Sequence, residues 1–289
     1  MRRSGSFAWL ALAGVVALVG VVGLIFALGG SDGDEPEDSQ IVWAVGDGAV
    51  APEDAEVPRD LADIIAGEVP DRFLYLGDVY EDGTAEEFEE NYDPLYGDLA
   101  PVTEPTPGDH EWGLRDEGYF PYWERARDRP LRPWYAVEVG EWEILNLNSQ
   151  APHDAGSEQL RWLRRHLASA PERCRIAMWH RPRYHAGLKP EYEDVDPLWE
   201  TVSGEVVAVL SGDEHNMQRL RPRDGMVQFV AGSGGRELDD VQEEDPRLAF
   251  ENDEEIGALR LELEADRLAF SFVAADGEML DSGVLPCRN

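Results

Sequence analysis

Lysine is almost absent from this sequence. Lys189 is the only lysine in 289 residues, and Lys and Arg together number 25 against 60 Asp and Glu, for a formal net charge of −35. A surface of this charge repels nucleic acid and anionic lipid, so binding of DNA or RNA over a broad face is excluded. Hydrophobic residues make up 43% of the chain, which is enough for a sizeable globular core.

Cysteine is also scarce. Cys174 and Cys287 are the only two cysteines of the chain. In an oxidising compartment a lone pair of cysteines is more often a disulfide than two free thiols. We therefore predict a disulfide that ties the strand before His180 to the C-terminus, with two distant thiols as the alternative.

The first thirty residues lack charge after two N-terminal arginines. The apolar run at 7–30 is long enough to span a membrane, and the acidic segment 31–40 follows it. The positive-inside rule keeps the arginines in the cytoplasm and exports the rest. We predict a transmembrane signal anchor at 1–30, an acidic linker at 31–40 and one domain at 41–289 outside the cytoplasm. The alternative is a long signal peptide that is cleaved, which would release a secreted domain.

Apolar runs and turn residues predict an α/β domain. Buried strands are expected at 41–45, 72–76, 175–179 and 205–210, a hairpin at 135–147, and C-terminal strands at 258–263, 268–273 and 279–285. Helices are expected at 58–66, from a cap at Thr84 through 90, and from Ser157 through Leu167. Strands that alternate with helices favour a mixed or parallel sheet covered by helices.

Several predicted strands end in an ionisable side chain. These side chains, or their counterparts in a loop flanked by Pro and Gly, are Asp47, Asp78, Asp109, His110, His180 and His215. In open α/β sheets the strand ends collect such groups at one rim. A single Gly-Asp pair is usually a turn. Five such sites in one chain instead predict a two-metal centre, which needs oxygen and nitrogen ligands and one bridging carboxylate.

Five short segments carry a family resemblance. Gly46-Asp-Gly48, Gly77-Asp-Val-Tyr80, Gly108-Asp-His-Glu111, Trp179-His180 and Gly212-Asp-Glu-His215 resemble, in order, the signature blocks of calcineurin-like metallophosphoesterases. The Gly-Asp opening, the tyrosine of the second block and the residues around the blocks resemble bacterial members of the purple acid phosphatase branch. The resemblance implies a sandwich of two mixed β-sheets flanked by helices. It also implies an extracytoplasmic enzyme that hydrolyses small phosphate mono- or diesters with a metal-activated hydroxide.

The resemblance also implies a role for each matching residue. Asp78 would bridge two metals, with Asp47, Tyr80 and His215 on the first and Asp109, His180 and Asp213 on the second. His110 would assist the substrate or leaving group, and His185 would be a second acid. Glu81, Glu111 and Arg219 would support the site or contact the substrate.

Three positions depart from the family pattern. Asp109 stands where the family has Asn, Asp213 stands where it has His, and Tyr80 lies one residue early, with Glu81 in the usual register. Three alternatives stay open: Tyr80 still binds, Glu81 replaces it, or the ligand is lost. The added carboxylates make the second site harder, which favours Mn²⁺ among the open choices of Mn, Fe, Zn and Mg. They also predict weak phosphate binding and a neutral to alkaline optimum. The shifted register of Tyr80 predicts that the protein is not purple.

Two other functions compete with the enzyme. A catalytically degenerate descendant would keep the fold as a surface binding module. A carboxylate-rich module that binds calcium for stability would ignore the resemblance altogether. Metal content and turnover of the purified protein separate the three.

Overall fold

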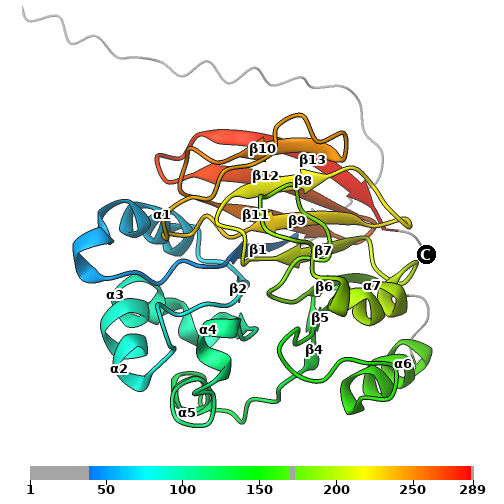
Figure 1. Cartoon of the computed structure of the whole chain (residues 1–289), viewed down its shortest axis with the longest axis horizontal. Helices are drawn as coiled ribbons and strands as arrows, with labels where there is room; N and C mark the ends of the chain where they lie inside the picture. The colour runs from blue at the N-terminus through cyan, green and yellow to red at the C-terminus, as the bar shows by residue number, and fades with distance from the viewer. Residues whose placement is uncertain (1–38, 170–172, 288–289) are drawn as a thin grey trace, which may run out of the picture. The chain divides into compact units, whose positions relative to one another are not determined.

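The computed structural model describes residues 39–169 and 173–287 (Figure 1). The predicted anchor at 1–30 and nearly all of the predicted linker at 31–40 lie outside the described residues. Within those two ranges no helix is long and apolar enough to cross a membrane.

One sheet of six strands holds the first parallel unit. Its order is β13-β12-β11-β1-β2-β3, and β1, β2 and β3 run parallel to one another. Its strands are β1 (Gln40–Val45), β2 (Arg72–Tyr75), β3 (Thr103–Pro105), β11 (Gly257–Glu264), β12 (Arg267–Ala274) and β13 (Met279–Pro286).

The second sheet has seven strands in the order β10-β8-β9-β7-β6-β5-β4. Strands β5, β6, β7 and β9 run parallel, and β4, β8 and β10 are antiparallel to their neighbours. Its strands are β4 (Tyr135–Val139), β5 (Trp142–Asn146), β6 (Cys174–Met178), β7 (Ala208–Ser211), β8 (Met217–Leu220), β9 (Val227–Ala231) and β10 (Leu248–Asn252).

Alternating side chains build three apolar layers. In β1, Val42 and Ala44 face the other sheet, where they meet residues such as Ile176, while Trp43 and Val45 face the helices. The described residues therefore form a sandwich of two mixed sheets with helices on both outer faces, as the sequence predicts (Figure 1).

The helices divide between the two outer faces. On the six-stranded sheet lie α1 (Glu56–Gly67), α2 (Ala85–Glu87), α3 (Asp93–Tyr96), α4 (Asp109–Trp112) and α5 (Tyr119–Ala126). On the seven-stranded sheet lie α6 (Glu158–Ser169) and α7 (Asp196–Val202). Short 3₁₀ turns occupy Pro52–Asp54, Gly97–Val102 and Glu193–Val195.

One helix differs from the sequence prediction. The helix expected from Thr84 through 90 keeps its Thr84 cap, but it widens after Glu87 into a π turn at Phe88–Tyr92. The widening ends just before Pro94, which has no N–H to continue an α-helical ladder.

The predicted disulfide is present between Cys174 and Cys287, with Cα atoms 5.5 Å apart. Cys174 begins β6 and Cys287 follows β13, so the bond joins a central strand of one sheet to the edge strand of the other.

Replacing both cysteines with alanine should lower stability without a change of fold. The bond closes a loop across a sequence separation of 113 residues, so we expect a loss of about 2–4 kcal/mol. The melting temperature, followed by circular dichroism, should fall to that of dithiothreitol-treated wild type. Two free thiols in the unreduced wild-type protein, found by mass spectrometry, would contradict the pairing.

Candidate metal centre

The carboxyl ends of parallel strands from both sheets meet at one edge. Asp47 follows β1, Asp78 follows β2 and Asp109 follows β3 in the first sheet, while His180 follows β6 and Asp213 follows β7 in the second. Backbone hydrogen bonds join the two sets of loops: the Gly46 amide donates to the Ala231 carbonyl at 2.8 Å, and the Gly234 amide donates to the Gly46 carbonyl at 3.2 Å.

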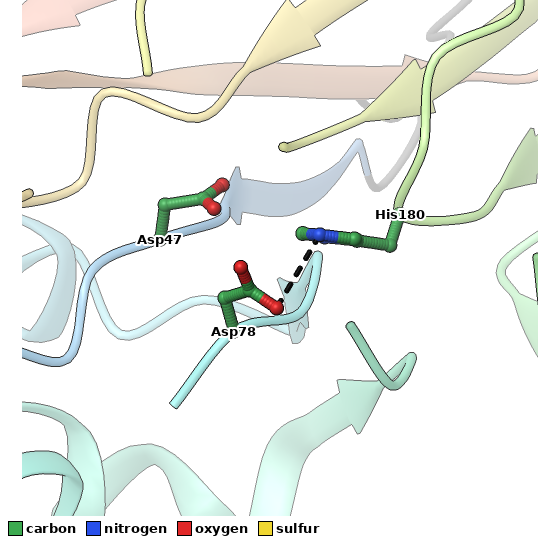
Figure 2. A group of neighbouring side chains, drawn as sticks. All are labelled: Asp47, Asp78 and His180. Atoms are coloured by element: carbon green, nitrogen blue, oxygen red, sulfur yellow. Dashed lines mark ion pairs between the residues drawn. The ribbon is translucent and has the colours of Figure 1, made fainter. Parts of the chain in front are cut away.

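Asp47, Asp78 and His180 form a first group of potential ligands (Figure 2). Each residue offers one ligand atom, and these atoms lie within 4.8 Å of one another. All three side chains are buried. Figure 2 shows the two carboxylates and the imidazole entering one space from three different loops.

Asp109, His180 and Asp213 form a second group by the same measure. The Nε2 atom of His180 lies 3.2 Å from Asp109 Oδ1, 3.5 Å from Asp213 Oδ1 and 3.3 Å from Asp78 Oδ1. His180 belongs to both groups, and Asp78 of the first group lies as near to its Nε2 as the two carboxylates of the second group do. The assignment of individual ligands stays a prediction.

The orientation of the His180 ring suits a metal ligand. Its Nδ1–H donates to the Leu76 carbonyl at 2.8 Å, which leaves Nε2 directed at the carboxylates. Burial lowers the pKa of His180, but the carboxylates of Asp78, Asp109 and Asp47 outweigh it and raise the pKa well above its ordinary value. The carboxylates that surround this ring therefore favour the binding of a cation.

His215 has the same orientation beside Asp47. Its Nδ1–H donates to the Glu237 carbonyl at 2.9 Å, and its Nε2 lies 3.5 Å from Asp47 Oδ1. Asp47 Oδ1 and Asp213 Oδ2 are buried without a hydrogen bond to any described residue. Buried acceptors without donors, next to imidazole nitrogens, fit divalent ions such as Mn²⁺, Fe²⁺ and Zn²⁺.

Backbone conformation presents these carboxylates. Asp47, Asp78 and Asp213 have φ angles of 58°, 62° and 67°, and Tyr80 has 55°. Such left-handed angles are uncommon for residues other than glycine and cluster at functional sites. Gly108 is required by close approach, because a Cβ there would lie 1.9 Å from Asp78 Oδ1.

Glu111 connects the second and third loops. Its buried carboxylate accepts hydrogen bonds from the amides of Gly108 at 2.9 Å, Asp78 at 3.2 Å and Val79 at 3.3 Å. Burial raises the pKa of Glu111 to about 7, with the neighbouring Asp78 charge as a second cause. Glu111 therefore acts as a support of the site and not as a substrate contact.

His110 lies at the open side of the centre. Its Nδ1–H donates to the Glu81 carbonyl, and its Nε2 lies 3.6 Å from Asp78 Oδ2. Burial lowers the pKa of His110, but the Asp78 carboxylate and the Glu81 carbonyl raise it by more, so the pKa lies above its ordinary value. The His110 side chain is 29% exposed and that of Asp78 is 4% exposed, so the ring lies between the buried carboxylate and solvent.

A cavity of about 820 Å³ opens beside the first group. Tyr80, His215 and Arg236 are among its lining residues. Arg236 donates to the Tyr80 carbonyl at 2.7 Å and to the Glu81 carboxylate at 3.2 Å. Tyr80 and Glu81 both line the cavity, and the Glu81 side chain is paired there with Arg236.

Two predicted residues do not join the centre. His185 is buried behind it, with Nδ1 3.5 Å from Glu214 Oε2, which does not support its role as a second acid. Arg219 lies on β8 and pairs through Nε and Nη2 with Asp281 of β13 at 2.6 and 3.0 Å. Its role is to join the two sheets, because the side chain of a strand residue points across the sandwich and not along the strand toward the loops.

A family model described as a calcineurin-like phosphoesterase matches residues 42–217. The chain belongs to the calcineurin-like phosphoesterase family. The matched segment begins in β1 and ends at the start of β8, so it includes all of the strand ends described above.

Curated relatives match parts of this phosphoesterase chain. Mouse tartrate-resistant acid phosphatase type 5 is 27% identical over 159 residues, which cover 50% of this chain and 48% of that protein. The 3',5'-cyclic adenosine monophosphate phosphodiesterase CpdA of Escherichia coli K12 is 31% identical over 122 residues, or 40% of this chain and 42% of that protein. The chain thus spans about half the length of the curated relatives it matches.

Solved structures share the fold. A purple acid phosphatase from yellow lupin, PPD1, superposes with a TM-score of 0.69 at 18% identity, over 86% of this chain and 54% of that one. GAP50 of Plasmodium gives a TM-score of 0.69 at 16% identity, over 87% and 90% of the two chains. The predicted resemblance to calcineurin-like and purple acid phosphatase proteins is confirmed.

The sequence pattern assigned no role to two cationic side chains beside the candidate centre, Arg236 and Lys189. Arg236 directly follows Gly232-Ser-Gly-Gly235, a segment that also resembles the family and could have pointed to this arginine. Lys189 was noticed only as the sole lysine, yet its Nζ donates to the carbonyl of Asp213 at 2.9 Å.

Glu111→Gln should loosen the metal centre and leave the fold intact. The amide keeps the shape of the side chain but turns one acceptor into a donor that faces backbone N–H groups, which costs about 1–3 kcal/mol. We expect a lower melting temperature and weaker Mn²⁺ binding, measured by calorimetric titration. Glu117→Gln, at an exposed position, is the matched control. Equal Mn²⁺ affinity in both variants would show that Glu111 does not support the ligands.

Proposed function

We propose that this chain is a metal-dependent phosphoesterase that acts outside the cytoplasm on small phosphate mono- or diesters. The observation that carries the proposal is the pair of carboxylate and histidine groups that share the buried His180 at five strand ends. Family membership and the similarity to phosphatases and a phosphodiesterase support it. The apolar run at 7–30 and the disulfide support the location.

Asp47, Asp78, Tyr80 and His215 would hold one divalent ion, and Asp78, Asp109, His180 and Asp213 the other. Two such ions would supply positive charge to the phosphoryl group and lower the pKa of a water. The buried carboxylates fix this geometry before substrate arrives, since their loops are already hydrogen-bonded in place.

His110 would donate a proton to the leaving oxygen. The Glu81 carbonyl fixes the ring through Nδ1, so that the proton to be transferred is on Nε2. The ring keeps 29% of its side-chain surface exposed, which leaves it open to the substrate. A proton donor placed this way contributes about 10²–10⁴-fold to a rate.

A second candidate is a surface binding module that has kept the fold. GAP50, which shares the fold over most of both chains, is described as the anchor in the inner membrane complex of Plasmodium. The substitutions at Asp109 and Asp213 favour this alternative. Bound metal without turnover would select it.

Asp78→Asn and His110→Ala should separate metal binding from proton transfer. Asp78→Asn removes the shared carboxylate, so it should lose bound metal and all turnover. His110→Ala should keep the metal and lower kcat by roughly 10²–10⁴-fold. His153→Ala, a histidine bonded to backbone carbonyls of Ala151 and Asp194, is the control. The assay is hydrolysis of a chromogenic phosphomonoester and diester. Loss of metal in His110→Ala with full activity per bound metal would overturn the assignment.

Mn²⁺ should restore more activity than Zn²⁺ to the chelator-treated protein. The second group has carboxylates at Asp109 and Asp213, and hard oxygen ligands favour Mn²⁺ and Mg²⁺ over Zn²⁺. Turnover is measured across a series of added metals at neutral and alkaline pH. A violet protein that keeps full activity after chelation would contradict this ligand chemistry.

A further inference from the structure

The sole lysine of the chain lies at the most negative edge of the candidate centre. Lys189 belongs to the loop between β6 and α7. Its Nζ lies 2.9 Å from the Asp213 carbonyl oxygen, 3.2 Å from Asp239 Oδ2 and 3.9 Å from Glu214 Oε1. One ammonium group thus contacts the backbone carbonyl of Asp213, a member of the second group, and the carboxylates of Asp239 and Glu214 beside it.

These acidic residues need a positive charge. Glu214 is fully buried, and neither of its carboxylate oxygens has a hydrogen bond within the described part of the chain. Asp213 is also buried, and its Oδ2 is likewise without a donor there. Uncompensated carboxylates in such a place are costly, and a fixed cation offsets that cost.

Formal charge shows why this matters for an anionic substrate. Asp47 and Asp78 alone would leave two positive charges on a pair of divalent ions. Adding Asp109 and Asp213 brings the carboxylates to four, which cancels the charge of the two ions. A phosphate group would then meet a centre with little net attraction. Lys189 is the nearest fixed cation beside Asp213, and 41% of its side chain is exposed.

We propose that Lys189 is a positioning residue that offsets negative charge beside the second metal site and so allows that site to bind a phosphate group. The proposal rests on the proposed function, because it needs a phosphorylated ligand at a two-metal centre. Asp239 connects this role to the substrate space, since it contacts Lys189 and also lines the cavity beside His215. The carbonyl contact further fixes Asp213 with Oδ1 toward His180.

The test measures binding of inorganic phosphate to the Mn²⁺-loaded full-length protein by isothermal titration calorimetry. Lys189→Met removes the charge and keeps a long side chain, and Lys189→Arg keeps the charge. Arg165→Met removes one positive charge from an exposed position on α6 and is the matched control. Metal content after gel filtration is measured on every preparation.

Lys189→Met should keep two Mn²⁺ ions per chain and raise the Kd for phosphate about tenfold or more, with the size of the effect limited by solvent screening. Lys189→Arg and Arg165→Met should stay within about threefold of wild type by the same reasoning. A phosphate Kd of Lys189→Met equal to wild type, with metal retained, would overturn the proposal. Loss of metal in Lys189→Met would also overturn it, because the lysine would then be needed to build the site.

Turnover in the same preparations separates this inference from the proposed function. If the wild type hydrolyses the ester and Lys189→Met binds phosphate as tightly as wild type, only the role of Lys189 is contradicted. If phosphate binding depends on Lys189 but no preparation hydrolyses the ester, only the proposed enzymatic function is contradicted.

Discussion

Mutual repulsion among clustered carboxylates, three of them buried, is the constraint on which this structure depends. Asp47, Asp78, Asp109 and Asp213 are brought together around the imidazole of His180, and two of their oxygens have no donor among described residues. Like charges at this separation destabilise a fold unless a cation lies between them. Contacts elsewhere in the molecule offset that repulsion. The two sheets bring five loops to one edge, and each loop that carries a candidate ligand is hydrogen-bonded to another part of the chain.

The ligand-bearing loops are fixed mainly by hydrogen bonds to their backbone groups, and less by contacts of the carboxylates. Glu111 gathers the amides of the second and third loops, and Arg236 joins the carbonyl of Tyr80 to the first loop through its own amide, which donates to Asp47 at 3.1 Å. Left-handed angles at Asp47 and Asp78 then turn the side chains inward. These backbone hydrogen bonds stabilise both the strained backbone angles and the close approach of the carboxylates. The centre is therefore arranged for cations before any cation binds.

Much of this was open to prediction from the sequence, and the limits have physical reasons. Strand ends followed by Asp or His predict a shared rim, because they are local patterns, whereas the two-sheet sandwich followed only from the family resemblance. The positions of Arg219 and His185 could not be predicted, since the direction of a side chain depends on which face of its strand or loop is buried. Lys189 and Arg236 escaped notice because their partners, at Asp213 and Tyr80, lie on loops distant in sequence.

Stability and chemistry occupy opposite ends of the same strand. Cys174 begins β6 and is bonded to Cys287, whereas His180 lies just past its other end, where the carboxylates meet. The covalent link between the two sheets is therefore as far along β6 from the candidate metals as the strand allows. The five residues of β6 are all buried, so the strand that connects the two ends is close-packed on both faces. The disulfide therefore holds the two sheets together at the end of β6 opposite the clustered carboxylates, and it uses none of the candidate ligands.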